Sequence, residues 1–305
     1  MILMTNYHIP VLYQQSLDAL DIDPNGTYVD VTFGGGGHSK GILEHLKNGR
    51  LIGFDRDADA TENGIDDERF TLVHHDYRWI SNFLEYNTSV PVNGILADLG
   101  VSSHQFDTAE RGFSFRQDAA IDMRMDNDIE QTAGDMLNTY SQAQLQSIFT
   151  IYGEIKNART LAQTVVSQRN SKKFATISDL ISVCEQVMRK SDKRSKYLSQ
   201  VFQALRIEVN QELKSLEMLL EQSASLIKPN GRLVVITYHS LEDRLVKNFI
   251  AKGNLQGKEE KDLYGNTIKP FDALNRKPII PTEAETAENP RARSAKLRIA
   301  VRRDE

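Results

Sequence analysis

Hydrophobic and polar residues in the first hundred positions follow two alternating patterns. Short apolar or β-branched runs of strand length alternate with helical segments such as 39–48, in which Ile42, Leu43 and Leu46 share one side. Strands that alternate with helices form parallel sheets with right-handed crossovers. This part of the chain therefore predicts an α/β domain. Its expected strands are 27–33, 50–55, 69–75 and 92–100.

From about residue 130 the pattern changes to one helix after another. The clearest apolar face comprises Leu145, Ile148, Phe149 and Tyr152. These positions have the i, i+3, i+4, i+7 spacing of a single helical face. Thr176 and Asp179 have the spacing of a capping box, which predicts that a helix begins there.

Strand patterns return towards the end of the chain. A long helix is expected from about 201 to 227, and the run GRLVVITYHS (231–240) has the pattern of a buried strand. Ser240 and Asp243 are the residues expected to cap the helix that follows. The closing run AKLRIAVRR (295–303) alternates apolar and polar residues, which predicts a strand with one buried face.

These patterns together predict an α/β domain, 1–110 and 205–305, that is interrupted by an all-helical insert, 111–204. A chain of 305 residues is long enough for such an organisation. With 40% hydrophobic residues the composition is that of a globular protein, and no apolar run is long enough to span a bilayer. The N-terminus lacks the pattern of a secretory signal, and Cys184 is the only cysteine, so a reducing cytoplasm is expected.

The net charge of −5 conceals an uneven distribution. Residues 1–150 carry 9 basic and 23 acidic side chains, whereas residues 151–210 carry 11 basic and 5 acidic ones. Residues 211–305 carry 17 basic and 14 acidic side chains. Such asymmetry indicates that one part of the surface meets a polyanion, although lysines that only solubilise a helical region would give the same pattern.

The first predicted strand runs into four consecutive glycines, Gly34 to Gly37. A glycine-rich turn at the carboxyl end of a strand lets backbone N–H groups approach a ligand, and the next helix adds partial positive charge. The G-x-G-x-x-G spacing of dinucleotide sites is not met, because its last position falls on Ser39 or Lys40. This disfavours a nucleotide-dependent oxidoreductase without excluding it.

Acidic residues lie in or at the ends of three of the predicted strands. Asp30 precedes the glycines inside the first strand, and Asp55 ends the second strand about 20 residues after the turn, the usual distance to an acid that binds a ribose. Asp98 ends the strand in ILADLGVSSHQFD and is followed by another glycine and a polar run. The arrangement predicts a nucleoside cofactor without saying which one.

Seven segments resemble one known family, the bacterial ribosomal RNA small subunit methyltransferase H family. They occur in the order HIPVL, DVTFGGGGHS, DLGVSSHQFDTAERGFSF, IDMRMD, FQALRIEVN, ITYHSLEDR and NPRARSAKLR, from His8 to about Arg298. The resemblance implies a class I, Rossmann-like methyltransferase that depends on S-adenosylmethionine and acts on N4 of a cytosine in the decoding region of 16S rRNA. The cofactor site that it implies consists of Gly36, Gly37, His38, Asp55, Tyr77, Asp98 and Gln105. Tyr77 stands where the family usually has phenylalanine.

Methylation of an exocyclic amine requires a group that orients the nitrogen and accepts its proton. Asp98 or a backbone carbonyl near Leu99 is the predicted acceptor, with assistance from Ser102 or Ser103. Methylation at carbon 5 would need a cysteine thiolate, and Cys184 lies on the apolar face of a predicted helix. Nitrogen is therefore the favoured target.

Candidates for contact with RNA combine aromatic and basic side chains. Phe113 and Phe115 interleave with Arg111, although a loop anchored by the two phenylalanines is the alternative. His239, at the end of a strand, is either a substrate contact or a structural hydrogen-bonding group. The remaining candidates are the basic segments 189–196 and 290–303, which include Arg291 and Arg293. The seven histidines show no metal-ligand spacing, so no metal site is predicted.

The sequence thus predicts a cytoplasmic rRNA (cytosine-N4-)-methyltransferase whose partner is 16S rRNA, within the 30S subunit or a late assembly intermediate. It leaves open whether the protein forms a homodimer, and no membrane association is expected. The alternative is a non-catalytic ribosome-assembly factor that binds S-adenosylmethionine.

Overall fold

The computed structural model describes residues 10–87 and 89–304, which form two compact units. The first comprises the described residues up to Gly100 together with those from Leu213 onwards, and the second is Val101–Glu212. The boundaries predicted for the insert, 111 and 204, lie within this second unit. His8 and Ile9, with which the segment HIPVL begins, lie outside the described residues.

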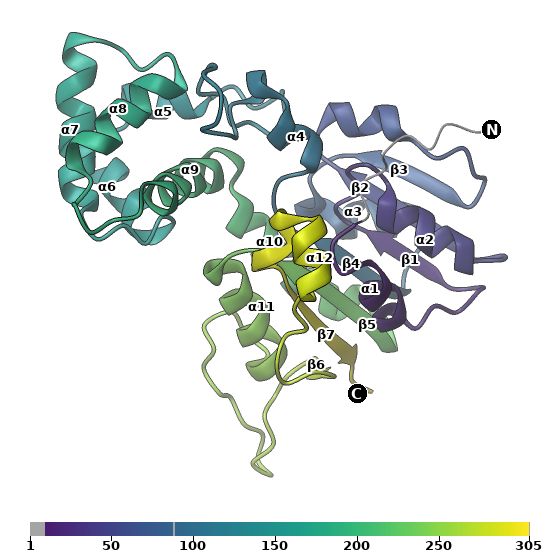
Figure 1. Ribbon diagram of the computed structural model, residues 1–305. Coiled ribbons are helices and arrows are strands. Elements are labelled where there is room, and N and C mark those ends of the chain that lie inside the picture. The colour runs from purple at the N-terminus through teal and green to yellow at the C-terminus, as the bar shows by residue number, and fades with distance from the viewer. Residues whose placement is uncertain (1–9, 88, 305) are drawn as a thin grey trace. The chain divides into compact units, whose positions relative to one another are not determined.

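The first unit is built on a sheet of seven strands among the described residues, in the order β3-β2-β1-β4-β5-β7-β6 (Figure 1). The first five strands in this order run parallel to one another, whereas β7 runs antiparallel to both β5 and β6. Because β1 lies between β2 and β4, the strand order reverses at β1 and β4. The strands are β1 (Thr27–Asp30), β2 (Arg50–Asp55), β3 (Phe70–His74), β4 (Val92–Asp98), β5 (Ile227–Thr237), β6 (Phe271–Ala273) and β7 (Lys296–Arg302).

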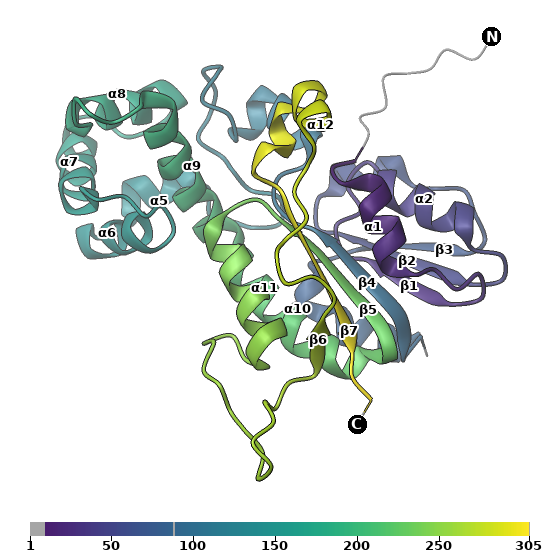
Figure 2. The same ribbon diagram turned by 60° about the horizontal axis from the view of Figure 1, so that its bottom comes forward.

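Helices cover both faces of this sheet, because successive residues of a strand point to opposite sides. Val29 of β1 belongs to the apolar cluster that includes residues of α3, α10 and α11, whereas its neighbour Tyr28 belongs to the cluster that includes residues of α1 and α2. Figure 2 shows α1 and α2 on one side of the sheet and α10 and α11 on the other. The helices are α1 (Tyr13–Leu20), α2 (Gly37–His45), α3 (Ile80–Tyr86), α10 (Glu212–Leu226), α11 (Ser240–Lys252) and α12 (Glu283–Glu288), with the 3₁₀ segments η1 (Ala58–Asn63), η2 (Tyr77–Trp79) and η4 (Pro290–Ser294).

The second unit is helical and has its own apolar core. Leu145, Ile148 and Phe149 are buried in this core as predicted, and Tyr152 is partly buried against it. The predicted capping box of Thr176 and Asp179 is confirmed at the start of α8. The helices are α4 (Ser103–Asp107), α5 (Ala133–Thr139), α6 (Gln142–Ile151), α7 (Ala158–Ser171), α8 (Ile177–Val187) and α9 (Arg194–Asn210), with the 3₁₀ segment η3 (Ala109–Arg111).

Two predictions about the elements were wrong. The helix expected from about 201 to 227 is divided at Gln211, whose φ of 49° lies in the left-handed region that ends an α-helix. The strand β7 was expected to bury one face, but both faces are buried, with Leu297 and Ile299 in one apolar cluster and Ala300 in the other. Arg298 of β7 is 8% exposed, and its charge is neutralised by Asp243 at 2.6 Å.

Among the residues that the structure describes, no helix has the length and apolar character needed to cross a membrane.

Candidate functional site

The glycine turn after β1 has the close backbone approach that a ligand site needs. Gly34 and Gly36 have φ angles of 53° and 74°, in the left-handed region that favours glycine. A Cβ atom on Gly37 would fall on the ring of Pro10. The nine-residue helix α2 begins at Gly37, so its N-terminal N–H groups face the turn.

Asp30 fixes the base of this turn. Its carboxylate accepts hydrogen bonds from the Ser39 hydroxyl at 2.7 Å and from the Thr32 backbone N–H at 3.1 Å. The side chain is buried, and this burial raises the pKa of the Asp30 carboxyl, with His38 opposing the shift. The residue therefore holds the first turn of α2 against the end of β1.

Asp55 joins the end of β2 to the same turn. Its Oδ2 accepts a hydrogen bond from the Gly34 N–H at 2.7 Å, and its Oδ1 accepts one from the Asp57 N–H at 2.9 Å. Burial raises the pKa of the Asp55 carboxyl against these two hydrogen bonds. A carboxylate has about four acceptor sites, so hydroxyl groups of a ribose could still be bound here.

Asp98, at the end of β4, faces two ring side chains. Its Oδ1 accepts a hydrogen bond from the Tyr238 hydroxyl at 2.8 Å, and its Oδ2 lies 3.5 Å from His38 Nε2. His38 is 5% exposed, and its ring stacks with that of Tyr13 at a centroid distance of 5.9 Å. Neither ring nitrogen of His38 has a hydrogen-bond partner among the described residues. A buried imidazole in this state is suited to bind a group that the structure does not contain.

Tyr77 follows β3 and is buried in the apolar core. Asp76 immediately before it lies 3.1 Å from both Arg56 and Arg78 and accepts a hydrogen bond from Ser215 at 3.0 Å. Although burial acts in the opposite direction, the two guanidinium groups hold the pKa of the Asp76 carboxyl below its usual range. This ion-pair network supports the segment that carries the predicted adenine contact.

Ser102, Ser103 and Gln105 belong to the second unit, where they form the start of α4. The Ser102 hydroxyl accepts a hydrogen bond from the Gln105 N–H at 3.1 Å, and Gln105 Oε1 accepts one from the Ser102 N–H at 3.1 Å. This is a capping box, and Ser103 is the first residue of the helix. Two predicted site residues thus also determine where α4 begins.

The aromatic and basic loop of the second unit is anchored to that unit. Phe113 is 6% exposed and lies in the core, and Phe115 packs edge-on against Phe202 at 5.5 Å. Arg111 donates hydrogen bonds of 3.1 Å to two carbonyl groups in 124–125. This placement favours the alternative in which the phenylalanines anchor a folded loop.

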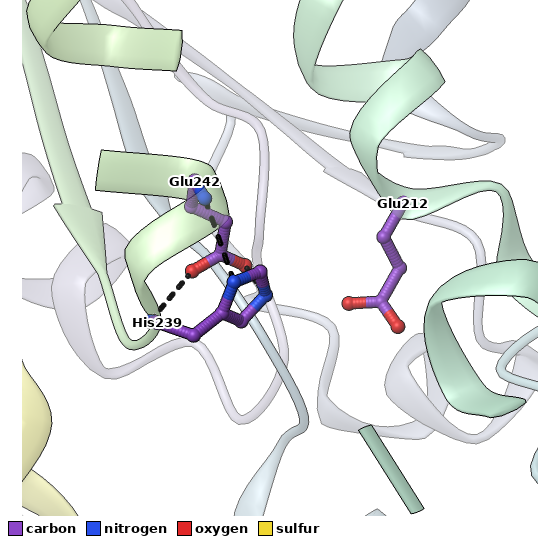
Figure 3. A group of neighbouring side chains, drawn as sticks. All are labelled: Glu212, His239 and Glu242. Carbon is purple, nitrogen blue, oxygen red and sulfur yellow. Dashed lines mark hydrogen bonds and ion pairs between the residues drawn. The ribbon is translucent and has the colours of Figure 1, made fainter. Parts of the chain in front are cut away.

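His239 caps α11, which corrects the expectation that Ser240 would do so. The Glu242 N–H donates to His239 Nδ1 at 3.4 Å, and Glu242 Oε2 accepts from the His239 N–H at 3.3 Å (Figure 3). Ser240 is the first residue inside the helix, so the cap lies one position earlier than predicted. Glu212, also labelled in Figure 3, belongs to the second unit, where it pairs with Arg206 at 2.8 Å.

Arg291 and Arg293 are exposed on the 3₁₀ segment η4, one on each side of the buried Ala292. The first unit therefore brings together the glycine turn, His38 and Asp98, and links Asp55 to the turn. Tyr238 is the residue that the predictions missed. It lies inside the run 231–240 that was predicted as a buried strand, near the carboxyl end of that run.

The fold and this site together define a class of protein. The open parallel sheet has a glycine turn and strand-end carboxylates where its order reverses, which is where α/β proteins bind nucleosides. The antiparallel β7 between β5 and β6 separates it from the all-parallel dinucleotide fold, whose glycine spacing the chain also lacks. The protein is therefore a Rossmann-like methyltransferase that uses S-adenosylmethionine.

Comparison with known proteins identifies the family. The model of the MraW methylase family matches residues 5–303, and the chain belongs to this family. A protein of Cytophaga hutchinsonii named ribosomal RNA small subunit methyltransferase H is 55% identical over 97% of this chain and 99% of its own length. A protein of the same name from Bacteroides thetaiotaomicron is 52% identical over 97% of this chain and 98% of its own length.

Among solved structures, an rRNA methylase from Streptococcus thermophilus aligns with 97% of this chain and 99% of its own, at 11% identity and a TM-score of 0.42. Membership of the family rests on the family model and the sequence relatives, not on this structure. The predicted fold class and cofactor are confirmed.

Proposed function

We propose that this protein transfers a methyl group from S-adenosylmethionine to N4 of a cytosine in the decoding region of 16S rRNA. Two relatives at 52% and 55% identity over 97% of the chain carry names that specify small-subunit rRNA as the substrate. The choice of cytosine N4 comes from the resemblance of the seven sequence segments. The observation that carries the proposal is the Asp98 carboxylate, held at the sheet edge between a phenol and an imidazole.

S-adenosylmethionine, when bound, supplies a methyl group on a positively charged sulfur. In the transfer, the N4 nitrogen forms a bond to this methyl carbon while the bond between carbon and sulfur breaks, and N4 loses one proton. Asp98 accepts that proton, because a carboxylate at hydrogen-bond distance both orients the amine and removes its charge. Ser102 or Ser103 assists by binding the cytosine.

Within the first unit, the residues that would hold the cofactor are those at the strand ends. Gly36 and Gly37 leave the backbone open, and the unpartnered nitrogens of His38 offer hydrogen bonds to a polar group. Asp55 suits the ribose hydroxyls, and Tyr77 suits the adenine.

Chemistry at carbon 5 of cytosine is disfavoured by the state of Cys184. The thiol is buried in the core of the second unit, and this burial raises its pKa to about 12. A thiol of this kind supplies almost no thiolate at neutral pH. Cys184 therefore belongs to the packing of α8.

The RNA would be bound by basic surfaces on both units. Residues 189–196 include Lys190, Lys193 and Lys196, all exposed. Arg291 and Arg293 are exposed as well, and the helical insert predicted at 111–204 would recognise the substrate. Contacts of this type position the RNA through its phosphates.

The test is methyl transfer from labelled S-adenosylmethionine to undermethylated 30S subunits and to protein-free 16S rRNA, followed by nucleoside mass spectrometry. We expect N4-methylcytidine, and the preferred substrate will show whether subunit assembly comes first. Asp98→Asn should reduce the single-turnover rate by about 100-fold. Asp66→Asn, an exposed carboxylate in the same unit, is the matched control.

Intact cofactor binding without transfer to either substrate would replace this proposal by the alternative, a ribosome-assembly factor that does not catalyse. A product methylated at carbon 5 would refute the choice of atom. An Asp98→Asn protein with the rate of the Asp66→Asn control would remove Asp98 from the role of proton acceptor.

A further inference from the structure

Tyr238 is the first residue after β5, and its side chain reaches the end of the neighbouring strand. In the parallel pairing of β4 and β5, Asp98 lies opposite Ile236, two residues before Tyr238. The Tyr238 hydroxyl donates a hydrogen bond of 2.8 Å to Asp98 Oδ1, and its backbone N–H donates one of 2.8 Å to Glu242. Strand pairing and two hydrogen bonds thus determine the position of this residue.

Gly100 lies beside the ring of Tyr238. Its φ is 103°, and a Cβ atom at this position would be in ordinary van der Waals contact with the ring, at 3.5 Å. Burial and the neighbouring Asp98 carboxylate raise the pKa of the Tyr238 phenol well above its usual range. The phenol therefore remains a neutral hydrogen-bond donor throughout the working pH range.

The two oxygens of Asp98 have different surroundings as a consequence. Oδ1 is occupied by the phenol, whereas Oδ2 lies 3.5 Å from His38 Nε2, which is too long for a strong hydrogen bond. Rotation about the Cβ–Cγ bond would turn both oxygens out of these positions, and the phenol opposes this rotation because its hydrogen bond to Oδ1 would be broken. Oδ2 is therefore the oxygen left for a reacting group.

We propose that Tyr238 is a positioning residue for methyl transfer, which holds the Asp98 carboxylate so that Oδ2 stays directed towards the amine that loses its proton. This inference rests on the proposed function, because it assigns to Tyr238 a task in the same reaction. A carboxylate whose orientation is fixed by a neighbouring hydrogen-bond donor stands ready to accept the proton. Loss of that hydrogen bond lowers the fraction of complexes with the productive geometry.

Tyr238→Phe removes one oxygen atom and keeps the ring. We expect the single-turnover rate at saturating cofactor to fall by about 10- to 100-fold, because the lost bond is a hydrogen bond to a charged group. The dissociation constant for S-adenosylmethionine should change by less than about 3-fold. Tyr197→Phe is the matched control, since it removes a buried phenol that donates to Asn157 at 3.1 Å in the second unit.

A double-mutant cycle tests whether Tyr238 acts through Asp98. In an Asp98→Asn background, Tyr238→Phe should lower the rate by no more than about 2-fold, because the group that it positions has already been lost. Fully multiplicative effects would overturn the inference, as would a Tyr238→Phe protein with the rate of the Tyr197→Phe control. An effect confined to cofactor affinity would also overturn it.

The same assay separates this inference from the proposed function. If the proposed function fails, the wild-type protein itself produces no N4-methylcytidine. If only the inference fails, the wild type and Tyr238→Phe produce it at equal rates.

Discussion

Three buried or partly buried carboxylates of the first unit differ in what neutralises them. Asp30 and Asp55 accept hydrogen bonds from hydroxyl or backbone groups, and burial raises the pKa of each carboxyl. A carboxyl group whose pKa is higher in the folded than in the unfolded state destabilises the fold once the pH exceeds the unfolded pKa. The reason is that its ionisation costs more free energy in the folded protein. Asp76 has two guanidinium partners, and the pKa of its carboxyl is lowered against the effect of burial. Its ionised form therefore stabilises the fold.

Asp76→Asn should lower the free energy of unfolding by about 3 kcal/mol near pH 7, because Arg56 and Arg78 would both lose their ion pair with Asp76 in a largely buried network. A lowered folded pKa contributes stability above the unfolded pKa of about 4, and this contribution is lost as the pH falls through the folded pKa. In urea unfolding, the difference between Asp76→Asn and the wild type should therefore shrink as the pH falls below the unfolded pKa of about 4.

The matched control for this change is Glu185→Gln, which removes a solvent-exposed carboxylate that pairs with Arg194 at 2.6 Å. Exposed pairs contribute little, so the unfolding midpoint should stay close to that of the wild type. An unfolding midpoint for Asp76→Asn equal to that of Glu185→Gln would contradict the stabilising role that we give to ionised Asp76.

At the scale of elements, a buried ion pair attaches α11 to β7. Asp243 of α11 lies 2.6 Å from Arg298 and 3.2 Å from Lys296, both in β7. Burial acts against ionisation, but hydrogen bonds from Arg298 and Lys296 lower the pKa of the Asp243 carboxyl. This contact fixes the helix that follows Tyr238 and His239 against the antiparallel end of the sheet.

Asp243→Asn should destabilise the protein by about 3 kcal/mol, because Arg298 would remain charged in a buried position. The double variant Asp243→Asn with Arg298→Met should recover most of this loss, since it removes both charges and leaves an apolar side chain in their place. Thermal and urea unfolding of the wild type, both single variants and the double variant would measure the coupling. Additive losses would show that the two residues act independently.

At the scale of the whole molecule, the two units have separate apolar cores. The core of the second unit draws its residues from 113–209, and the two cores of the first unit contain none of them. The glycine turn, Asp55, Tyr77 and Asp98 all belong to the first unit. Cofactor binding should therefore stabilise the first unit more than the second.

Hydrogen exchange with and without S-adenosylmethionine tests this expectation. At a cofactor concentration of about 100 times the dissociation constant, ligand binding stabilises by about 2.7 kcal/mol. We expect slower amide exchange in β1, α2 and β4, and unchanged exchange in α6, α7 and α8. Equal protection of the second unit would mean that both units respond to the cofactor as one.

Local sequence patterns were sufficient to predict several parts of this protein. The strand β2 lies at 50–55 as predicted, because an uninterrupted apolar run bounded by polar residues identifies a buried strand without reference to its neighbours. The capping box at Thr176 depends only on residues three positions apart. The glycine turn and its distances from Asp30 and Asp55 could be predicted for the same reason, because they depend only on positions along the sequence.

Tertiary structure decided which distant segments meet. The second buried face of β7 carries Arg298 and depends on α11, whose Asp243 pairs with Arg298 from 55 positions away along the chain. Phe113 was ambiguous because an aromatic side chain suits a core as well as a nucleic-acid surface, and only packing distinguishes the two. The contact between Tyr238 and Asp98 joins residues 140 positions apart, and it exists because β4 and β5 are neighbours in the sheet. Strand order of this kind is a property of the whole fold, so no local pattern could contain it.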